Sequence, residues 1–206
     1  MKKLVIIGAG GHGKVAADIA VKNEYEEILF LDDDGAVKAC GRYPVIGKGN
    51  MIGEIGGDVF VAIGNPAVRK AIQGGIGEER LTILIHPDAV IAEDVVIERG
   101  TIVMAGAVIN PGSRIGRGCI INTCTSVDHD CRLGEYVHVA VGAHVAGNVE
   151  IGNGTWIGAG ATVSNDLRIC GGCIIGAGAA VVKNIEESGT YVGVPAKRIK
   201  YCAEGG

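Results

Sequence analysis

The hydrophobic pattern of the second half of the chain repeats every six residues. From Ile85 to Val181 every sixth residue is Ile, Leu or Val, which gives 17 aliphatic residues without a break. A period of six matches neither the 3.6-residue period of a helix nor the alternation of an isolated strand. It is typical of a hexapeptide solenoid, a parallel β-helix in which three hexads form one coil and each coil stacks on the previous one. We therefore predict about five coils with no long loop between them.

The first 84 residues follow a different pattern, in which apolar runs alternate with helical segments. The runs predict strands at 3–7, 28–31, 59–63 and 81–84, with helices ending near Asn23 and covering about 67–73. Such alternation is typical of a parallel sheet with helices on its faces. We therefore expect an α/β, Rossmann-like domain over residues 1–84, followed by an all-β solenoid with a C-terminal tail over 85–206.

A glycine-rich turn follows the first predicted strand. Gly8-x-Gly10-x-x-Gly13 matches the dinucleotide fingerprint, and Asp32 follows about 20 residues later. Backbone amides at a helix N-terminus bind phosphate, so the turn suits a nucleotide. An NAD domain needs two mononucleotide halves, and residues 1–84 supply only one. The pattern favours a single nucleotide diphosphate over NAD, and a purely structural tight turn is the alternative.

Polar residues near this turn are candidates for the same ligand. His12 could reach a phosphate or a sugar hydroxyl, and Asp32 and Asp33 end the second predicted strand. Their carboxylates could accept hydrogen bonds from a ribose or a base. A solvated acidic turn is the alternative interpretation of Asp33.

The candidate for acid–base chemistry is His129, which lies between Asp128 and Asp130 at a predicted corner. A general base needs an imidazole with a near-neutral pKa that a carboxylate holds in place. Gly147 follows one coil later and would leave space and a backbone N–H beside the ring. His138 is a second candidate, and an ordinary polar surface histidine is the alternative for both.

Composition narrows the classes of function. The net charge of −4 argues against a nucleic-acid partner. The apolar run at 4–7 is too short for a signal peptide or a membrane span. Seven scattered cysteines indicate reduced thiols and a cytoplasmic protein, and the pair Cys170 and Cys173 lacks further ligands for zinc.

Several segments together resemble the bacterial sugar acetyltransferases of the NeuD/PglD type, which are left-handed β-helix acyltransferases. The resemblance covers nearly the whole chain, and the combination of the two parts is more specific than the hexads alone. The matching segments are Ile6-Ile-Gly-Ala-Gly-Gly-His-Gly13, Phe30-Leu-Asp-Asp33, Ala62-Ile-Gly-Asn65, Ile121-Asn-Thr123, His129-Asp-Cys131, Gly142-Ala-His-Val-Ala-Gly-Asn148 and Gly193-Val-Pro-Ala-Lys197.

The resemblance implies roles for particular residues. His129 matches the general base, and Asp130 stands where the family usually has a Glu that raises the basicity of the histidine. His138 matches a histidine near the acetyl-CoA thioester, and the N–H of Gly147 matches a donor that polarises the thioester carbonyl. Two further groups are implied: Ala159 and Ala177 at the pantetheine arm, and Gly10, Gly11, His12, Gly13, Asp32 and Asp33 at the nucleotide sugar.

The implied activity is direct acetyl transfer from acetyl-CoA to the 4-amino group of a UDP-4-amino-4,6-dideoxy-N-acetylhexosamine. It requires a homotrimer with acetyl-CoA between neighbouring prisms, and no metal or NAD. An O-acetyltransferase of sialic acid, as in the NeuD branch, is the alternative. More remote alternatives are a non-catalytic solenoid and a γ-carbonic-anhydrase-like zinc protein using His129, His138 and His144.

Overall fold

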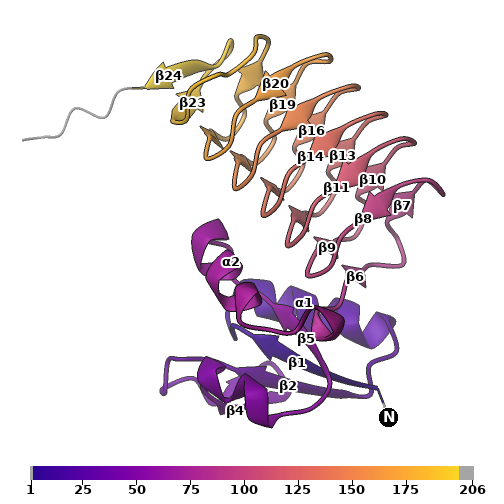
Figure 1. Cartoon of the computed structure of the whole chain (residues 1–206), viewed down its shortest axis with the longest axis vertical. Coiled ribbons are helices and arrows are strands. Elements are labelled where there is room, and N and C mark those ends of the chain that lie inside the picture. Colours follow the sequence, from indigo (N-terminus) through magenta and orange to yellow (C-terminus); the bar gives the residue numbers. More distant parts are fainter. Residues whose placement is uncertain (1, 200–206) are drawn as a thin grey trace, which may run out of the picture.

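The computed structural model describes residues 2–199, and its N-terminal part is a five-stranded sheet flanked by helices (Figure 1). The strand order is β3-β4-β2-β1-β5, with β1, β2, β4 and β5 parallel and β3 antiparallel to β4. The elements are β1 (Lys3–Ile7), α1 (Gly11–Lys22), β2 (Glu27–Leu31), β3 (Ala39–Cys40), β4 (Tyr43–Gly47), η1 (Gly49–Glu54), β5 (Asp58–Val61), α2 (Pro66–Gly74) and η2 (Glu78–Arg80).

The expected solenoid is confirmed, and its strands form three flat faces. Face C carries β6, β9, β12, β15, β18, β21, β23 and β24, face D carries β7, β10, β13, β16, β19 and β22, and face E carries β8, β11, β14, β17 and β20. The strands are β6 (Leu84–Ile85), β7 (Val90–Ile91), β8 (Val96–Ile97), β9 (Ile102–Val103), β10 (Val108–Ile109), β11 (Arg114–Ile115), β12 (Ile120–Ile121), β13 (Ser126–Val127), β14 (Arg132–Leu133), β15 (His138–Val139), β16 (His144–Val145), β17 (Glu150–Ile151), β18 (Trp156–Ile157), β19 (Thr162–Val163), β20 (Arg168–Ile169), β21 (Ile174–Ile175), β22 (Ala180–Val181), β23 (Thr190–Val192) and β24 (Lys197–Ile199).

The hexad aliphatics form one continuous core inside the prism. From Val103 to Val181 each of them is buried, whereas Ile85, Ile91 and Ile97 of the first coil are half-buried because no coil lies beneath them. Every coil contributes one side chain per face, so the core grows by the same increment with each turn of the chain.

The N-terminal part packs against face C of the first coils. Leu84, Ile102 and Ile120 of face C pack in one cluster with the buried side of α1 and with Phe30 and Phe60 of the sheet. The side-chain amide of Asn23 pairs with the backbone of Ile85, donating to its carbonyl at 2.7 Å and accepting from its N–H at 3.1 Å. These contacts cover the edge of β6, which would otherwise present unpaired backbone groups.

Two details of the N-terminal part differ from the expectation. The strand predicted at 81–84 is not formed: Leu81 makes only an isolated bridge to Val59, and the chain turns there from the sheet to β6. The hairpin of β3 and β4 was missed, because its residues alternate irregularly and are only partly buried. Tertiary pairing with β2 makes β4 part of the sheet.

Candidate active site

The glycines of the loop between β1 and α1 divide into two kinds. A Cβ at Gly13 would lie 2.2 Å from the carbonyl oxygen of Gly8, and Gly8 itself has a φ of +105° with Ala62 O 2.9 Å from its Cβ position. These two glycines are therefore required for the tight turn and for close packing of α1. A Cβ at Gly10 or Gly11 would meet no atom within 4 Å, so this surface is open to a ligand.

The carboxylates of Asp32 and Asp33 brace this loop and its neighbour. Asp32 accepts from the N–H of Ala9 at 2.7 Å and from the N–H of Asp34 at 2.9 Å, one through each oxygen. Asp33 accepts from the N–H of Gly49 at 3.0 Å. Both acids thus hold backbone segments at the carboxyl end of the parallel sheet, where nucleotides bind in open α/β folds.

His12 is the second residue of α1. Its ring lies edge-on to Phe60, with 6.3 Å between ring centroids. Burial, and after it the positive charge of Arg69, lower the pKa of His12 to about 4, so the ring is neutral at physiological pH. Its Nε2 is buried without a hydrogen-bond partner among residues 2–199.

His138 lies on face C in β15 and is fixed by two neighbours. Its ring stacks on Trp156 with centroids 4.8 Å apart, and its Nε2 lies 3.2 Å from Nδ2 of Asn122. Because Oδ1 of Asn122 accepts from the N–H of Thr123, the amide presents its NH₂ to the ring, which assigns the proton of the neutral imidazole to Nδ1. Nδ1 is buried and has no hydrogen-bond partner in the described part of the chain.

The pKa of His138 is lowered to about 3, first by burial and then by the charges of Arg69 and His12. His12 belongs to the N-terminal part and His138 to face C, and both rings are neutral at physiological pH.

His129 lies at the corner between faces D and E and is exposed. Its Nδ1 is 2.9 Å from Oδ2 of Asp130, and this hydrogen bond is the main cause of a raised pKa of the imidazole. Asp128 does not touch the ring, because its Oδ1 accepts from Nδ2 of Asn110 and from the N–H of His129, both at 2.8 Å. Asp130 is therefore the acid that orients His129.

Gly147 provides the space for the ring of His129. A Cβ at Gly147 would lie 2.5 Å from Nε2 of His129, so a larger residue would displace the imidazole. Ala159 and Ala177 lie at a different corner, between faces C and D, where both are exposed and stacked on successive coils. The carbonyl of Ala159 accepts from the N–H of Gly178 at 2.8 Å.

A single chain does not gather all of these residues at one place. The open glycines, His12 and His138 lie at the junction with face C, Ala159 and Ala177 lie at the C/D corner, and His129 with Asp130 lies at the D/E corner. The width of face D separates the last two groups.

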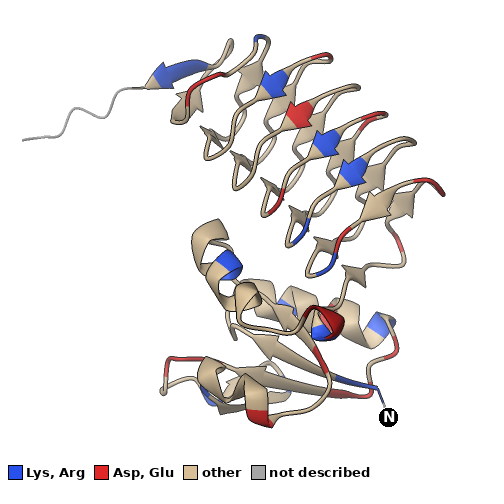
Figure 2. Cartoon of the chain, in the orientation of Figure 1, with Lys and Arg blue, Asp and Glu red and all other residues tan. Residues whose placement is uncertain are grey.

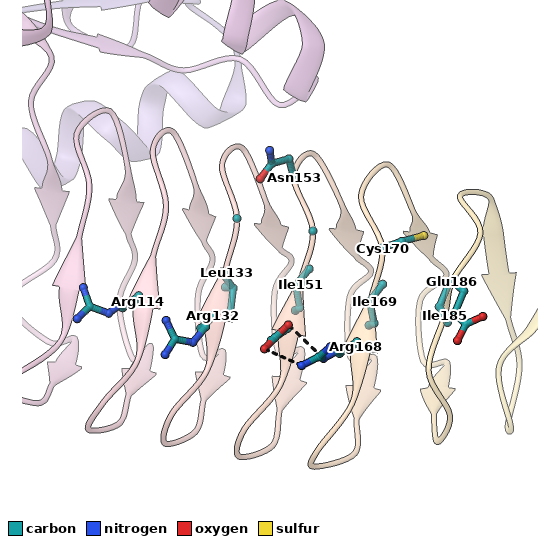
Figure 3. Close-up of a pocket in the computed structure, with 13 residues that line it drawn as sticks. Arg114, Arg132, Leu133, Ile151, Asn153, Arg168, Ile169, Cys170, Ile185 and Glu186 are labelled. Atoms are coloured by element: carbon teal, nitrogen blue, oxygen red, sulfur yellow. Dashed lines mark hydrogen bonds and ion pairs between the residues drawn. The ribbon is translucent and has the colours of Figure 1, made fainter.

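Face E carries a separate groove that none of the expected site residues forms. Arg114, Arg132, Glu150 and Arg168 occupy equivalent positions on successive strands and point outward (Figures 2 and 3). Arg168 pairs with Glu150 at 3.3 Å, while Gly134 and Gly152 deepen the groove.

Sequence reasoning missed Arg69, which is fully buried and contacts both parts of the chain. The motif Asn65-Pro66 signals only the start of α2, where the side chain of Asn65 caps the helix at Ala67 and Val68. Nothing in the local sequence distinguishes Arg69 from the exposed Lys70 that follows it.

Residues 2–199 hold neither a metal-binding cluster nor a membrane-spanning helix. In this range no three His, Cys, Asp or Glu side chains converge as metal ligands would. None of the helices described is both long enough and apolar enough to cross a bilayer.

Comparison with known proteins extends the resemblance seen in the sequence. Residues 3–76 match the family model described as the PglD N-terminal domain. The UDP-N-acetylbacillosamine N-acetyltransferase of Bacillus subtilis (strain 168) is 36% identical over 113 residues, which are 51% of this chain and 52% of that protein. The chain thus spans about half the length of this relative in the alignment.

Two further matches cover more of the chain. The GDP-perosamine N-acetyltransferase of Escherichia coli O157:H7 is 31% identical over 157 residues, 71% of each protein. The structure of the acetyltransferase domain of PglB from Neisseria gonorrhoeae FA1090, in complex with acetyl coenzyme A, has 40% identity and a TM-score of 0.91 over 96% of this chain and 99% of that one. The fold is therefore the left-handed β-helix of these acetyltransferases with a small α/β part before it.

Proposed function

The chain belongs to the NeuD/PglD-type family of bacterial sugar acetyltransferases, and from this we propose that it transfers the acetyl group of acetyl-CoA to the amino group of a nucleotide-linked amino sugar. Residues 1–84 would bind the nucleotide sugar, and the solenoid would bind acetyl-CoA. The observation that carries the proposal is the pair of His129 and Asp130, held at 2.9 Å beside the space that Gly147 leaves open.

The chemistry is a direct transfer in a ternary complex. The amine attacks the thioester carbon while Nε2 of His129 removes a proton from the nitrogen. The C–S bond then breaks, and CoA leaves as a thiolate that takes up a proton. Asp130 stabilises the imidazolium that forms on His129, as a carboxylate beside a general base does. The N–H of Gly147 is the candidate donor to the carbonyl oxygen, and His138 is the histidine expected near the thioester.

The separation of these residues within one chain supports a homotrimer with shared sites. His129 cannot meet the open glycines of its own chain, because it lies at the D/E corner and they lie in the α/β part, which packs against face C. In a cyclic trimer the D/E corner of one prism can approach the C/D corner and the α/β part of the next. We infer that each site takes its base from one subunit and its nucleotide-sugar loop from another.

The finer substrate assignment is a UDP-4-amino-4,6-dideoxy-N-acetylhexosamine. The Bacillus relative is named for a UDP-linked sugar and the Escherichia relative for a GDP-linked one, so the two relatives differ in the nucleotide of the substrate. His12 after the open glycines and the paired Asp32 and Asp33 favour the branch that acts on UDP-linked amino sugars.

The deciding experiment measures thiol release from acetyl-CoA with a panel of acceptors. The panel contains the UDP-linked 4-amino sugar, GDP-perosamine, sialic acid, and a UDP-sugar with a hydroxyl in place of the 4-amine as the matched control. We expect turnover with the UDP-linked amine and none with its hydroxyl counterpart. Preference for GDP-perosamine would change the assigned nucleotide from UDP to GDP. Turnover of sialic acid alone would overturn the proposal that the enzyme acetylates an amine.

A further inference from the structure

Arg69 carries the most unusual contacts in the described part of the chain. It is a fully buried cation, and all its hydrogen-bond acceptors are backbone carbonyls. No carboxylate of residues 2–199 forms an ion pair with it. A buried charge without a counter-ion is costly unless several dipoles solvate it, so this arrangement needs a reason beyond packing.

The acceptors of Arg69 lie on both parts of the chain. On the N-terminal side, Nη1 donates to the carbonyls of Ile63 and Gly64 at 2.7 and 2.8 Å, directly after β5. On the solenoid side, Nε donates to the carbonyl of Gly118 at 2.7 Å and Nη2 donates to the carbonyl of Tyr136 at 3.1 Å. Gly118 and Tyr136 occupy the same corner of successive coils. The planar fork of Arg69 therefore spans the junction and two coils at once.

The next turn of α2 repeats the contact one coil lower. Gln73, also fully buried, donates through Nε2 to the carbonyl of Gly100 at 3.2 Å. Arg69 and Gln73 lie on one face of α2, four residues apart, and together they reach the same corner in three consecutive coils. Gly118 cannot be replaced by a larger residue here, since its Cβ would lie 2.5 Å from the ring of Tyr136. The helix α2 is thus docked along the E/C corner in a fixed register (Figure 1).

We propose that Arg69 is a positioning residue, which fixes the α/β part with His12 and the nucleotide-sugar loop relative to face C, which carries His138. This inference rests on the proposed function only for the identity of the ligands. The α/β part supplies His12 and the open glycines, whereas the solenoid supplies His138, and Arg69 hydrogen bonds to both parts.

Electrostatics adds a second effect of the same side chain. The charge of Arg69 lowers the pKa of both His12 and His138, in each case after burial, and His12 also acts on His138. Both rings are consequently neutral, which leaves one acceptor and one donor nitrogen on each. A protonated ring here would repel Arg69 and lose an acceptor.

The test compares Arg69→Met, Arg69→Lys and the control Lys70→Met, an exposed neighbour on the same helix. Calorimetry measures the Kd of UDP, GDP and acetyl-CoA, and NMR follows the imidazole titrations of His12 and His138 in the full chain. In Arg69→Met we expect nucleotide binding to weaken about tenfold or more, because small displacements of a positioned group cost this much, while acetyl-CoA binding stays within about twofold. Both imidazole pKa values should rise.

Arg69→Lys separates charge from geometry. An ammonium keeps the positive charge but lacks the planar fork, so it cannot bridge the same four carbonyls. We expect weaker nucleotide binding with imidazole pKa values that stay close to those of the wild type. Lys70→Met should change neither.

A merely structural role would give a different result. If Arg69→Met lowers Tm but leaves nucleotide affinity and both titrations unchanged, the proposal is wrong. Should Arg69→Met not fold, unchanged nucleotide affinity in Arg69→Lys would overturn it equally. If the wild type binds neither UDP nor GDP, the proposed function fails instead, and the histidine titrations in the variants then decide the role of Arg69 alone.

Discussion

Two aspartates flank His129, and the backbone decides which of them orients the ring. Asp130 adopts a left-handed conformation with a φ of 59°, which turns its carboxylate toward Nδ1. Asp128 instead binds Asn110 and the N–H of His129. Asp130 therefore orients the ring of His129, whereas Asp128 holds the backbone and Asn110.

The first prediction concerns the base. His129→Ala should lower kcat by about 10²–10⁴-fold, the usual contribution of a general base, with little change in acetyl-CoA affinity. Steady-state kinetics and calorimetry measure the two quantities. His144→Gln is the histidine control, because His144 pairs only with the hydroxyl of Ser126 on face D. Near wild-type turnover in His129→Ala would exclude it as the base.

The second prediction is a pH dependence. The hydrogen bond that the carboxylate of Asp130 accepts from His129 raises the pKa of the imidazole. Because catalysis needs the neutral ring, activity should fall as pH drops through this raised pKa. Asp130→Asn removes the carboxylate and should move the acid limb of kcat/KM to lower pH, while the plateau falls. In Asp128→Asn the shift should be smaller. An equal shift in both variants would contradict the assignment of Asp130.

At the scale of elements, the glycines of the turn between β1 and α1 have two functions, which are close backbone packing and access for a ligand. Gly8 and Gly13 serve the backbone, since a Cβ at either would collide with main-chain atoms. Gly10 and Gly11 present open surface at the start of α1, where N–H groups point outward. Fold and ligand binding are therefore assigned to different glycines of the same loop.

The third prediction follows from this division. Gly11→Val should raise the KM for the nucleotide sugar strongly, leave the KM for acetyl-CoA nearly unchanged and preserve Tm, because its side chain enters the ligand space only. Gly13→Ala should destabilise the fold by about 1–3 kcal/mol through overpacking against Gly8. Kinetics and thermal unfolding separate the two effects. Loss of stability in Gly11→Val, or none in Gly13→Ala, would show that the division is wrong.

At the scale of the whole molecule, the prism keeps apart the residues that the proposed reaction must bring together. His129 lies at the D/E corner, whereas the open glycines belong to the α/β part, which packs against face C. A closed ring of subunits is the symmetric arrangement that joins different surfaces of identical chains.

The fourth prediction uses this separation. Subunits carrying His129→Ala and subunits carrying Gly11→Val should each be nearly inactive, yet mixed oligomers should regain activity. In a cyclic trimer with random mixing, about a quarter of the sites would combine an intact base with an intact loop. Co-expression, separation by tags and a turnover assay measure the recovery. No recovery in verified mixed oligomers would place the whole site within one chain.

The periodic part of the fold could be predicted from the sequence, and the hexads from Val103 to Val181 form the buried core as expected. Each coil carries the six-residue pattern independently, so an irregular residue in one coil does not change the prediction for the others. The glycine turn, α1 and the β/α alternation were also legible, because turn chemistry and apolar runs act over short distances. His129 and Asp130 are adjacent in sequence, so the contact between their side chains depends only on the local backbone conformation at the corner.

Only the tertiary structure decided how the two parts meet. The strand predicted over 81–84 is divided between the two parts, because Leu81 bridges Val59 of the sheet while Leu84 already begins β6 of the first coil. Arg69 of α2 is joined to the E/C corner through the carbonyls of Gly118 and Tyr136, which lie far along the chain. Burial then sets the protonation of both histidines, since a pKa depends on solvent and on charges that arrive from distant segments.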